Sequence, residues 1–139
     1  MIDLVSQNPM IQLSAAAMTL SNRRMGLIAA NLANIDTPNY RTKDFNFEAA
    51  FNSAMADMDR QLSPTSSTPS YFKDSKSALN PEIIDPVDIT SERNDGNDVH
   101  LDRETMNLSK AQETFQLASN LAQTELKKVL GAIRDAAAK

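Results

Sequence analysis

The chain has 139 residues, the size of one ordinary domain, and contains no Cys, no Trp, one His and three Gly. The absence of Cys excludes disulfides, thiolate metal sites and cysteine nucleophiles, and a single His excludes any site that needs two imidazoles. Mean hydropathy is −0.40, and no apolar run approaches the ~20 residues that a bilayer crossing requires. The first residues have no basic start followed by an apolar core, so we expect no cleaved secretory signal.

The net charge of −4 is concentrated in the middle of the chain. Residues 1–36 carry two acids and two bases, residues 37–100 carry eleven acids and six bases, and residues 101–139 carry five acids and six bases. No segment is a basic patch. Because nucleic-acid binding needs a cationic footprint, we do not expect a nucleic-acid partner.

A helix is predicted for residues 9–34, with Asn8 as its cap and Pro9 at the first helical position. Two apolar stripes, each with a seven-residue period, lie ~200° apart around this helix. A helix with two apolar faces needs more than one packing partner. The first stripe consists of Leu4, Ile11, Met18, Met25 and Leu32, and the second of Leu13, Leu20 and Leu27.

A second long helix is predicted for residues 101–139, with Asp102 as its cap and Glu104 in its first turn. Its small side chains allow a neighbouring helix to approach closely, and the repeat favours coiled-coil-like packing, with an ordinary amphipathic bundle helix as the alternative. The seven-residue repeat comprises Leu101, Leu108, Phe115, Ala122, Val129 and Ala136, with Ala111, Ala118 and Ala132 at intermediate positions.

These patterns predict an all-α dominated fold in which the two terminal helices pair as a coiled-coil-like hairpin. We expect an irregular polar segment over residues 38–100, between an N-terminal segment 1–37 and a C-terminal helix 101–139. Within it, the stretch from Ser63 to Pro81 is rich in Ser, Thr and Pro and buries too little to order by itself. Alternating apolar residues around Asn94-Asp95-Gly96 indicate a short β-hairpin near 86–101.

No catalytic, cofactor-binding or metal-binding residues are predicted. An EF-hand with Gly96 at its sixth position would place Ser91 and Arg93 where carboxylates are required. The only histidine, His100, lies beside Asp98 and Asp102, but a lone histidine of this kind is interpreted as a solvated or capping residue rather than a metal ligand or catalyst.

One segment is more specific. Asn31-Leu32-Ala33-Asn34 is followed by Thr37-Pro38-Asn39-Tyr40. Pro38 cannot continue the helix, which must therefore end near residues 34–36. If the following turn is of type II, Asn39 must adopt a positive φ, which only Gly and Asn do readily.

These two blocks resemble the N-terminal signature of the bacterial flagellar rod and hook proteins, with Asn39 where that family usually has Gly. The block from Asn97 to Glu104, which includes Asp102 and Arg103, resembles the start of the C-terminal helix in proximal rod subunits, although His100 stands where Asp is usual. The resemblance extends over the whole chain, but these blocks carry its specificity.

The resemblance implies a structural subunit of the basal-body rod, without enzymatic activity or cofactor, that polymerises helically through its terminal helices. The implied partners are copies of itself, other rod subunits, the membrane-ring base with its small rod adaptor protein, and the flagellar type III export apparatus, with no small-molecule substrate. The implied location is the periplasmic rod. Another rod subunit, or a non-polymerising coiled-coil adaptor or export chaperone, is the alternative; an adaptor explains the heptads but not the signature blocks.

The two stripes then predict an assembly interface. Our hypothesis is that the first stripe faces the chain's own C-terminal helix and the second faces other subunits; the opposite assignment stays open. Residues of the C-terminal repeat complete the predicted interface, namely Leu108, Phe115, Ala122 and Val129.

Overall fold

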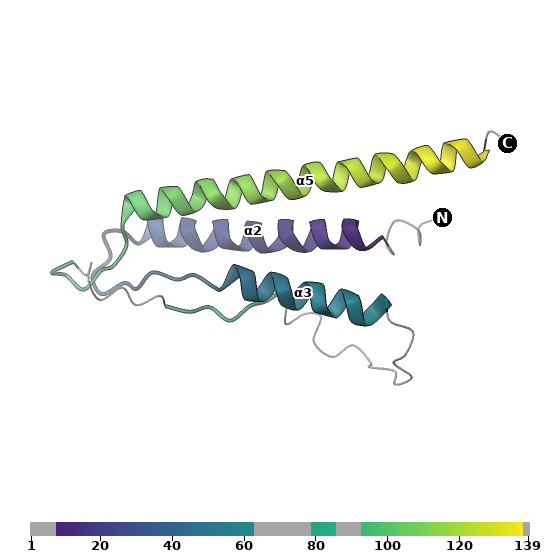
Figure 1. Ribbon diagram of the computed structural model, residues 1–139. Coiled ribbons are helices and arrows are strands. Elements are labelled where there is room, and N and C mark those ends of the chain that lie inside the picture. The colour runs from purple at the N-terminus through teal and green to yellow at the C-terminus, as the bar shows by residue number, and fades with distance from the viewer. Residues whose placement is uncertain (1–7, 63–78, 86–92, 138–139) are drawn as a thin grey trace.

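The computed structural model describes residues 8–62, 79–85 and 93–137, which contain three helices (Figure 1). They are α2 (Pro9–Ala33), α3 (Phe47–Leu62) and α5 (Leu101–Ala137). α2 lies between the other two helices, and α5 runs antiparallel to it along its length. The predicted fold class, dominated by two long paired terminal helices, is therefore confirmed.

α2 begins where the local chemistry predicts. The Asn8 side chain accepts hydrogen bonds from the backbone N–H of Met10 at 2.9 Å and of Ile11 at 3.4 Å, and Pro9 opens the helix. The helix ends at Ala33, one residue earlier than expected, because Asn34 serves as its C-terminal cap.

α5 begins at Leu101, so Asp102 is its second residue and the prediction that Asp102 caps the helix is wrong. The carbonyl of His100 instead accepts the first-turn N–H of Glu104 at 2.9 Å. Both Asp102 and Glu104 lie in the first turn, where their charge complements the helix dipole. At 37 residues, α5 is longer than the 25-residue α2.

Small side chains fill the contact between α2 and α5. On α5, Ala111 and Ala118 are 4% and 7% exposed, as the predicted close approach requires. On α2, Ser14 and Ser21 are fully buried one heptad apart, followed by Ile28. The sequence reading missed this seam, because two of its three members are polar residues that usually lie on the outside.

The predicted irregular middle contains a helix that the sequence did not reveal. α3 packs against the face of α2 that carries Leu20, whose side chain is completely buried with Phe45 and Ala50. The rings of Phe47 and Phe51 are stacked with centroids 6.1 Å apart and cover the same cluster. The amphipathic α3 thus encloses one side of α2 within the chain.

This arrangement corrects the stripe hypothesis for Leu20. Its side chain was expected to contact other subunits, but it is 0% exposed because Phe45 and α3 cover it. Leu27 of the same stripe also packs against this cluster. The sequence could not anticipate the covering element, because α3 had been assigned to irregular chain.

Elsewhere in the middle segment, the backbones of Asp44 and Ile84 exchange two hydrogen bonds, of 3.0 and 2.8 Å, as an isolated antiparallel bridge. The turn predicted at residues 94–96 forms, with Gly96 N–H donating to the carbonyl of Arg93 at 2.9 Å. The first strand of the expected hairpin, near 86–92, and most of the Ser/Thr/Pro-rich stretch lie outside the described residues. The second strand does not form, because residues 97–100 are irregular chain and Leu101 already begins α5. In the part of the chain that the structure describes, no helix combines the length and apolarity needed to cross a membrane.

Replacing Leu20 with Asp should unfold the chain rather than only weaken its association. A carboxylate at this fully buried position has no partner, so we expect the free energy of unfolding to fall by about 4 kcal/mol or more. Thermal unfolding followed by circular dichroism measures the loss. Asn22→Asp, which places the same charge on an exposed position of α2, should change stability by less than about 1 kcal/mol. Equal effects of the two substitutions would contradict the burial of Leu20.

Candidate functional site

The side-chain amide of Asn31, which is 1% exposed, joins three parts of the chain. Its Nδ2 donates to the carbonyl of Lys43 at 3.0 Å and to Oε2 of Glu104 at 3.1 Å. Its Oδ1 accepts the backbone N–H of Lys43 at 3.0 Å and the hydroxyl of Tyr40 at 3.2 Å. Because both donors and both acceptor positions are used, the amide is fully satisfied although it is buried.

Asn97, with no exposed surface, closes the C-terminal end of α2. Its Nδ2 lies 3.0, 3.1 and 2.9 Å from the carbonyl oxygens of Asn34, Ile35 and Thr37, and donates to them. Its Oδ1 accepts the backbone N–H of Val99 at 2.7 Å. The carbonyls of Asn34 and Thr37 also accept the N–H groups of Thr37 and Tyr40, so the turn is hydrogen-bonded within itself and Asn97 ties it to the start of α5.

The turn after α2 packs directly against the turn before α5. Asn39 has φ of 58°, and the Tyr40 N–H donates to the carbonyl of Thr37, as expected for a type II turn. The Asn39 N–H donates to the carbonyl of Asp95 at 3.0 Å. Gly96 has φ of 76°, and a Cβ at this position would lie 2.6 Å from Oδ1 of Asn39. The predicted positive φ at Asn39 is confirmed, and Gly96 is required by the same contact.

Asp98, 2% exposed, ties the extended chain after the turn to the start of α5. Its Oδ1 accepts the backbone N–H and the hydroxyl of Thr42, both at 2.6 Å. Arg103 donates from Nη2 to the carbonyl of Asp98 at 2.8 Å and to Oγ1 of Thr42 at 3.1 Å, and its Nε lies 3.7 Å from Oε1 of Glu104. Two buried carboxylates are therefore held by one guanidinium, one amide and one Thr.

Burial raises the pKa of the Tyr40 hydroxyl above its ordinary value of 10.0, and the charges of Glu104, Asp85 and Asp98 raise it further. Tyr40 therefore remains a hydrogen-bond donor to Asn31 throughout the neutral range. Lys43 Nζ lies 6.0 Å from the centre of the Tyr40 ring, which adds a cation–π contact on the exposed side.

An ion pair connects this region to the α3 side of the molecule. Arg24 donates from Nε and Nη2 to the two carboxylate oxygens of Asp44, at 3.1 and 2.6 Å. Asp44 Oδ1 also accepts the N–H of Phe45 at 2.9 Å. The forked geometry fixes the chain where it enters the Leu20 cluster.

The residues just described (Asn31, Asn34, Thr37–Thr42, Asn97, Asp98, Arg103 and Glu104) are called the polar cluster below. The hydrogen bonds and ion pairs described above all join one segment of this chain to another. Within residues 8–62, 79–85 and 93–137, no three of His, Cys, Asp and Glu are grouped so that they could hold a metal ion. The side chains of the polar cluster therefore stabilise the fold.

Most of the predicted interface residues lie on the partly exposed surface of α2 and α5 rather than in the core. Leu4 is outside the described residues, and Leu20 is buried within the chain. The other members are partly exposed, so their side chains can reach beyond the chain: Ile11, Leu13, Met18, Met25, Leu27, Leu32, Leu108, Phe115, Ala122 and Val129.

Sequence reasoning found the signature residues but not all their partners. Thr42 and Asp98 are 56 positions apart and neither belongs to a repeat, so no local signal marks their contact. The sequence also missed exposed apolar residues of α5, such as Leu117 and Leu130, which are 64% and 63% exposed. Their exposure could not be predicted, because it depends on which side of α5 is covered by α2.

Comparisons with known proteins agree with this geometry. Residues 11–41, from the first turns of α2 to the chain after the turn, match the family described as "Flagella basal body rod protein". The chain is similar to "Flagellar basal body rod protein FlgB" of Borrelia hermsii, with 30% identity over 118 residues that cover 76% of this chain and 82% of the relative. It is also similar to the protein of the same description from Buchnera aphidicola subsp. Acyrthosiphon pisum (strain APS), with 25% identity over 123 residues, 88% of this chain and 92% of the relative.

Replacing Asn31 with Leu should lower the free energy of unfolding by about 2–5 kcal/mol, because the buried Glu104 carboxylate and the Lys43 N–H lose their partner. Chemical denaturation monitored by circular dichroism measures this change. Asn22→Leu makes the same substitution on the exposed side of α2 and should cost less than about 1 kcal/mol. A loss for Asn31→Leu no larger than that of the control would show that the cluster does not stabilise the fold.

The three glycines should respond to Ala in opposite directions. Gly96→Ala should destabilise the chain by about 1–2 kcal/mol because of its positive φ and the contact with Asn39. Gly26→Ala and Gly131→Ala, where a Cβ meets nothing within 4 Å, should stabilise α2 and α5 by about 0.5–1 kcal/mol each. Midpoints of thermal unfolding report both signs, and a neutral Gly96→Ala would argue against the interlocked turns.

Proposed function

Because the chain belongs to the flagellar basal body rod proteins of the FlgB type, we propose that it is a structural subunit of the proximal rod. It works with other rod components. The observation that carries the proposal is the polar cluster, in which two signature segments some 60 residues apart fasten α2 to the start of α5. A fastened antiparallel helix pair is a stiff unit suited to repeated packing.

Assembly proceeds by helical polymerisation through the two terminal helices. Heterologous contacts that do not close on themselves produce open helical assemblies. The partly exposed apolar residues on the flanks of α2 and α5 supply such contacts, while Leu20 is excluded from them by its burial. The first stripe, from Ile11 to Leu32, can then contact neighbouring subunits as well as the chain's own α5.

Other partners follow from the position of a proximal rod subunit. They are the membrane-ring base with its small rod adaptor, and the flagellar type III export apparatus, which delivers the chain to the periplasmic rod without signal cleavage. The lack of Cys supports this route, because an exported chain without thiols forms no stray disulfides outside the cytoplasm. The role requires no catalysis and no cofactor.

A non-polymerising adaptor or export chaperone is the competing function. The paired helices fit it equally well, but the similarity to FlgB proteins extends over most of the chain and favours the rod. Another rod subunit of the same family is the nearer alternative, and the description of both relatives as FlgB favours the proximal position.

Quantitative mass spectrometry of purified basal bodies tests the proposal. We expect the chain as a fixed multi-copy component of the rod, and deletion of its gene should abolish swimming. Met18→Asp, on the partly exposed first stripe, should fold but be depleted from basal bodies about tenfold. Thr19→Asp, exposed and ~100° away on α2, is the matched control. Recovery of the chain only in the soluble cell fraction would favour the adaptor or chaperone.

A further inference from the structure

The end of α5 extends beyond the beginning of α2. Asn31 of α2 is hydrogen-bonded to Glu104 of α5, and the two helices run antiparallel. Since both rise about 1.5 Å per residue, Pro9 is level with about residue 126 of α5. α5 continues to Ala137, so its last turns pass the first turn of α2 by about 16 Å, as Figure 1 shows.

This overhang carries an apolar face with a basic margin. Leu126, Val129, Leu130 and Ile133 follow the i, i+3, i+4, i+7 spacing of one helix face. Leu130 is 63% and Leu126 is 37% exposed, and the other two are partly exposed. We call these four residues the overhang face. Lys127 and Arg134 are exposed beside it, whereas Lys128 pairs with Glu125 at 2.7 Å.

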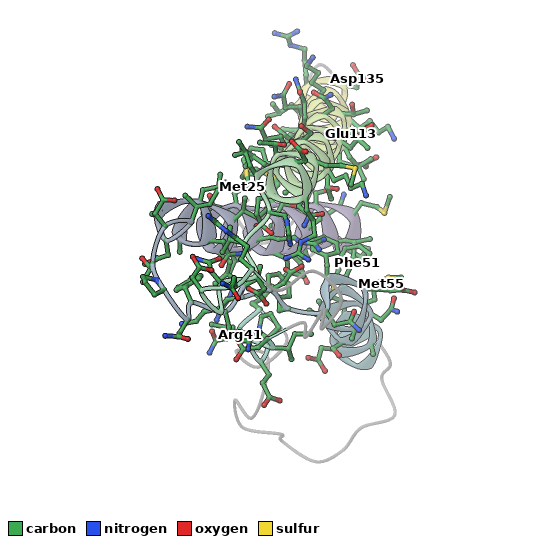
Figure 2. All side chains as sticks on the ribbon, turned by 90° about the vertical axis from the view of Figure 1, so that its left-hand side faces the viewer. Met25, Arg41, Phe51, Met55, Glu113 and Asp135 are labelled. Atoms are coloured by element: carbon green, nitrogen blue, oxygen red, sulfur yellow. The ribbon has the colours of Figure 1, made fainter. Side chains whose placement is uncertain are left out.

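A surface of matching chemistry lies on α3. Met55 is 41% exposed, and Phe51 is partly exposed on the same side of the helix (Figure 2). Glu48 is exposed in the first turn, and α3 as a whole carries three acids and one base. We call Glu48, Phe51 and Met55 the α3 edge. It is an apolar strip with an acidic margin, complementary to the apolar strip with a basic margin on α5.

The two surfaces of one chain cannot meet each other. α2 lies between α3 and α5, and the overhang projects past the end of α2 (Figure 1). A contact between them therefore joins two molecules. Such a contact uses different surfaces on the two copies and leaves one of each free, so it can continue without closing.

We propose that the overhang face of one copy binds the α3 edge of a second copy. The proposal rests on the function given above and identifies a contact between like subunits of the rod. Four apolar side chains on about two helical turns bury far less than the ~800 Å² per partner of a stable complex. A single contact is therefore weak, and many contacts act together in an assembly. Because the overhang face has a basic margin and the α3 edge has an acidic margin, salt should weaken the contact.

Disulfide formation in this cysteine-free chain tests the contact. Leu130→Cys and Met55→Cys, each with one thiol, are purified, mixed at high concentration and oxidised. We expect the mixed 130–55 disulfide to exceed by about tenfold the product of the Leu117→Cys and Met55→Cys pair, since Leu117 is equally exposed but lies ~140° around α5 from Leu130 and before the overhang. Lys127→Glu should reduce the yield severalfold, and Glu48→Lys on the other copy should restore it.

Other possible partners of the overhang face would give different results in this assay. A dominant 130–130 disulfide would assign the overhang face to the same face of a second copy, and equal yields for positions 130 and 117 would mean random collision. Slow reaction of the thiol at position 130 with maleimide in dilute chain would indicate that the chain covers this face itself. Each result overturns the proposal. The assay uses purified chain, so a selective 130–55 disulfide would support this contact even if the chain were absent from basal bodies. If the chain is present in basal bodies but the 130–55 disulfide does not form, only this contact is refuted and the proposed function is not.

Discussion

One buried amide links the parts of this molecule that are farthest apart in sequence. The side chain of Asn31 is shared by the end of α2, the chain around Lys43 and the first turn of α5 at Glu104. In a low-dielectric interior each unpaired group would be costly, so these contacts form together or not at all. The packing of α2 on α5 depends on this, because a seam of Ser and Ala has few large side chains to define the register. A single buried Asn specifies register in coiled coils in the same way.

The two faces of α2 are held by different physics. Towards α5, small residues such as Ser21 and Ala118 let the helices approach closely, and the polar cluster sets their alignment. Towards α3, Leu20 and the rings around Phe45 form an ordinary hydrophobic contact, closed at one end by the Arg24–Asp44 pair. With both faces covered inside the chain, the apolar residues on the flanks stay partly exposed, as the proposed assembly requires. A rod subunit needs this division between internal and external contacts.

Features that depend on local geometry could be predicted from the sequence. The cap at Asn8, the positive φ of Asn39 and the burial of Ala111 follow from rules that involve only a few neighbouring residues. Features that depend on what covers a residue could not. Leu20 looked like an outward contact until α3 was seen to cover it, and the link from Thr42 to Asp98 spans 56 positions with no repeating pattern. The family signature identified most of the polar cluster's residues, but not Thr42, and did not reveal that the two distant blocks form one unit.

The antiparallel pair has two chemically different ends. At one end both helices stop together at interlocked turns, where Gly96 and Asn39 are in contact. At the other end α5 continues to Ala137, past the first turn of α2. A filament whose subunits all point the same way therefore has a polarity: one tip presents the interlocked turns and the other presents the ends of α5. Addition at the two tips involves different surfaces, so growth rates at the two tips are free to differ, and directional growth can originate in the asymmetry of a single chain.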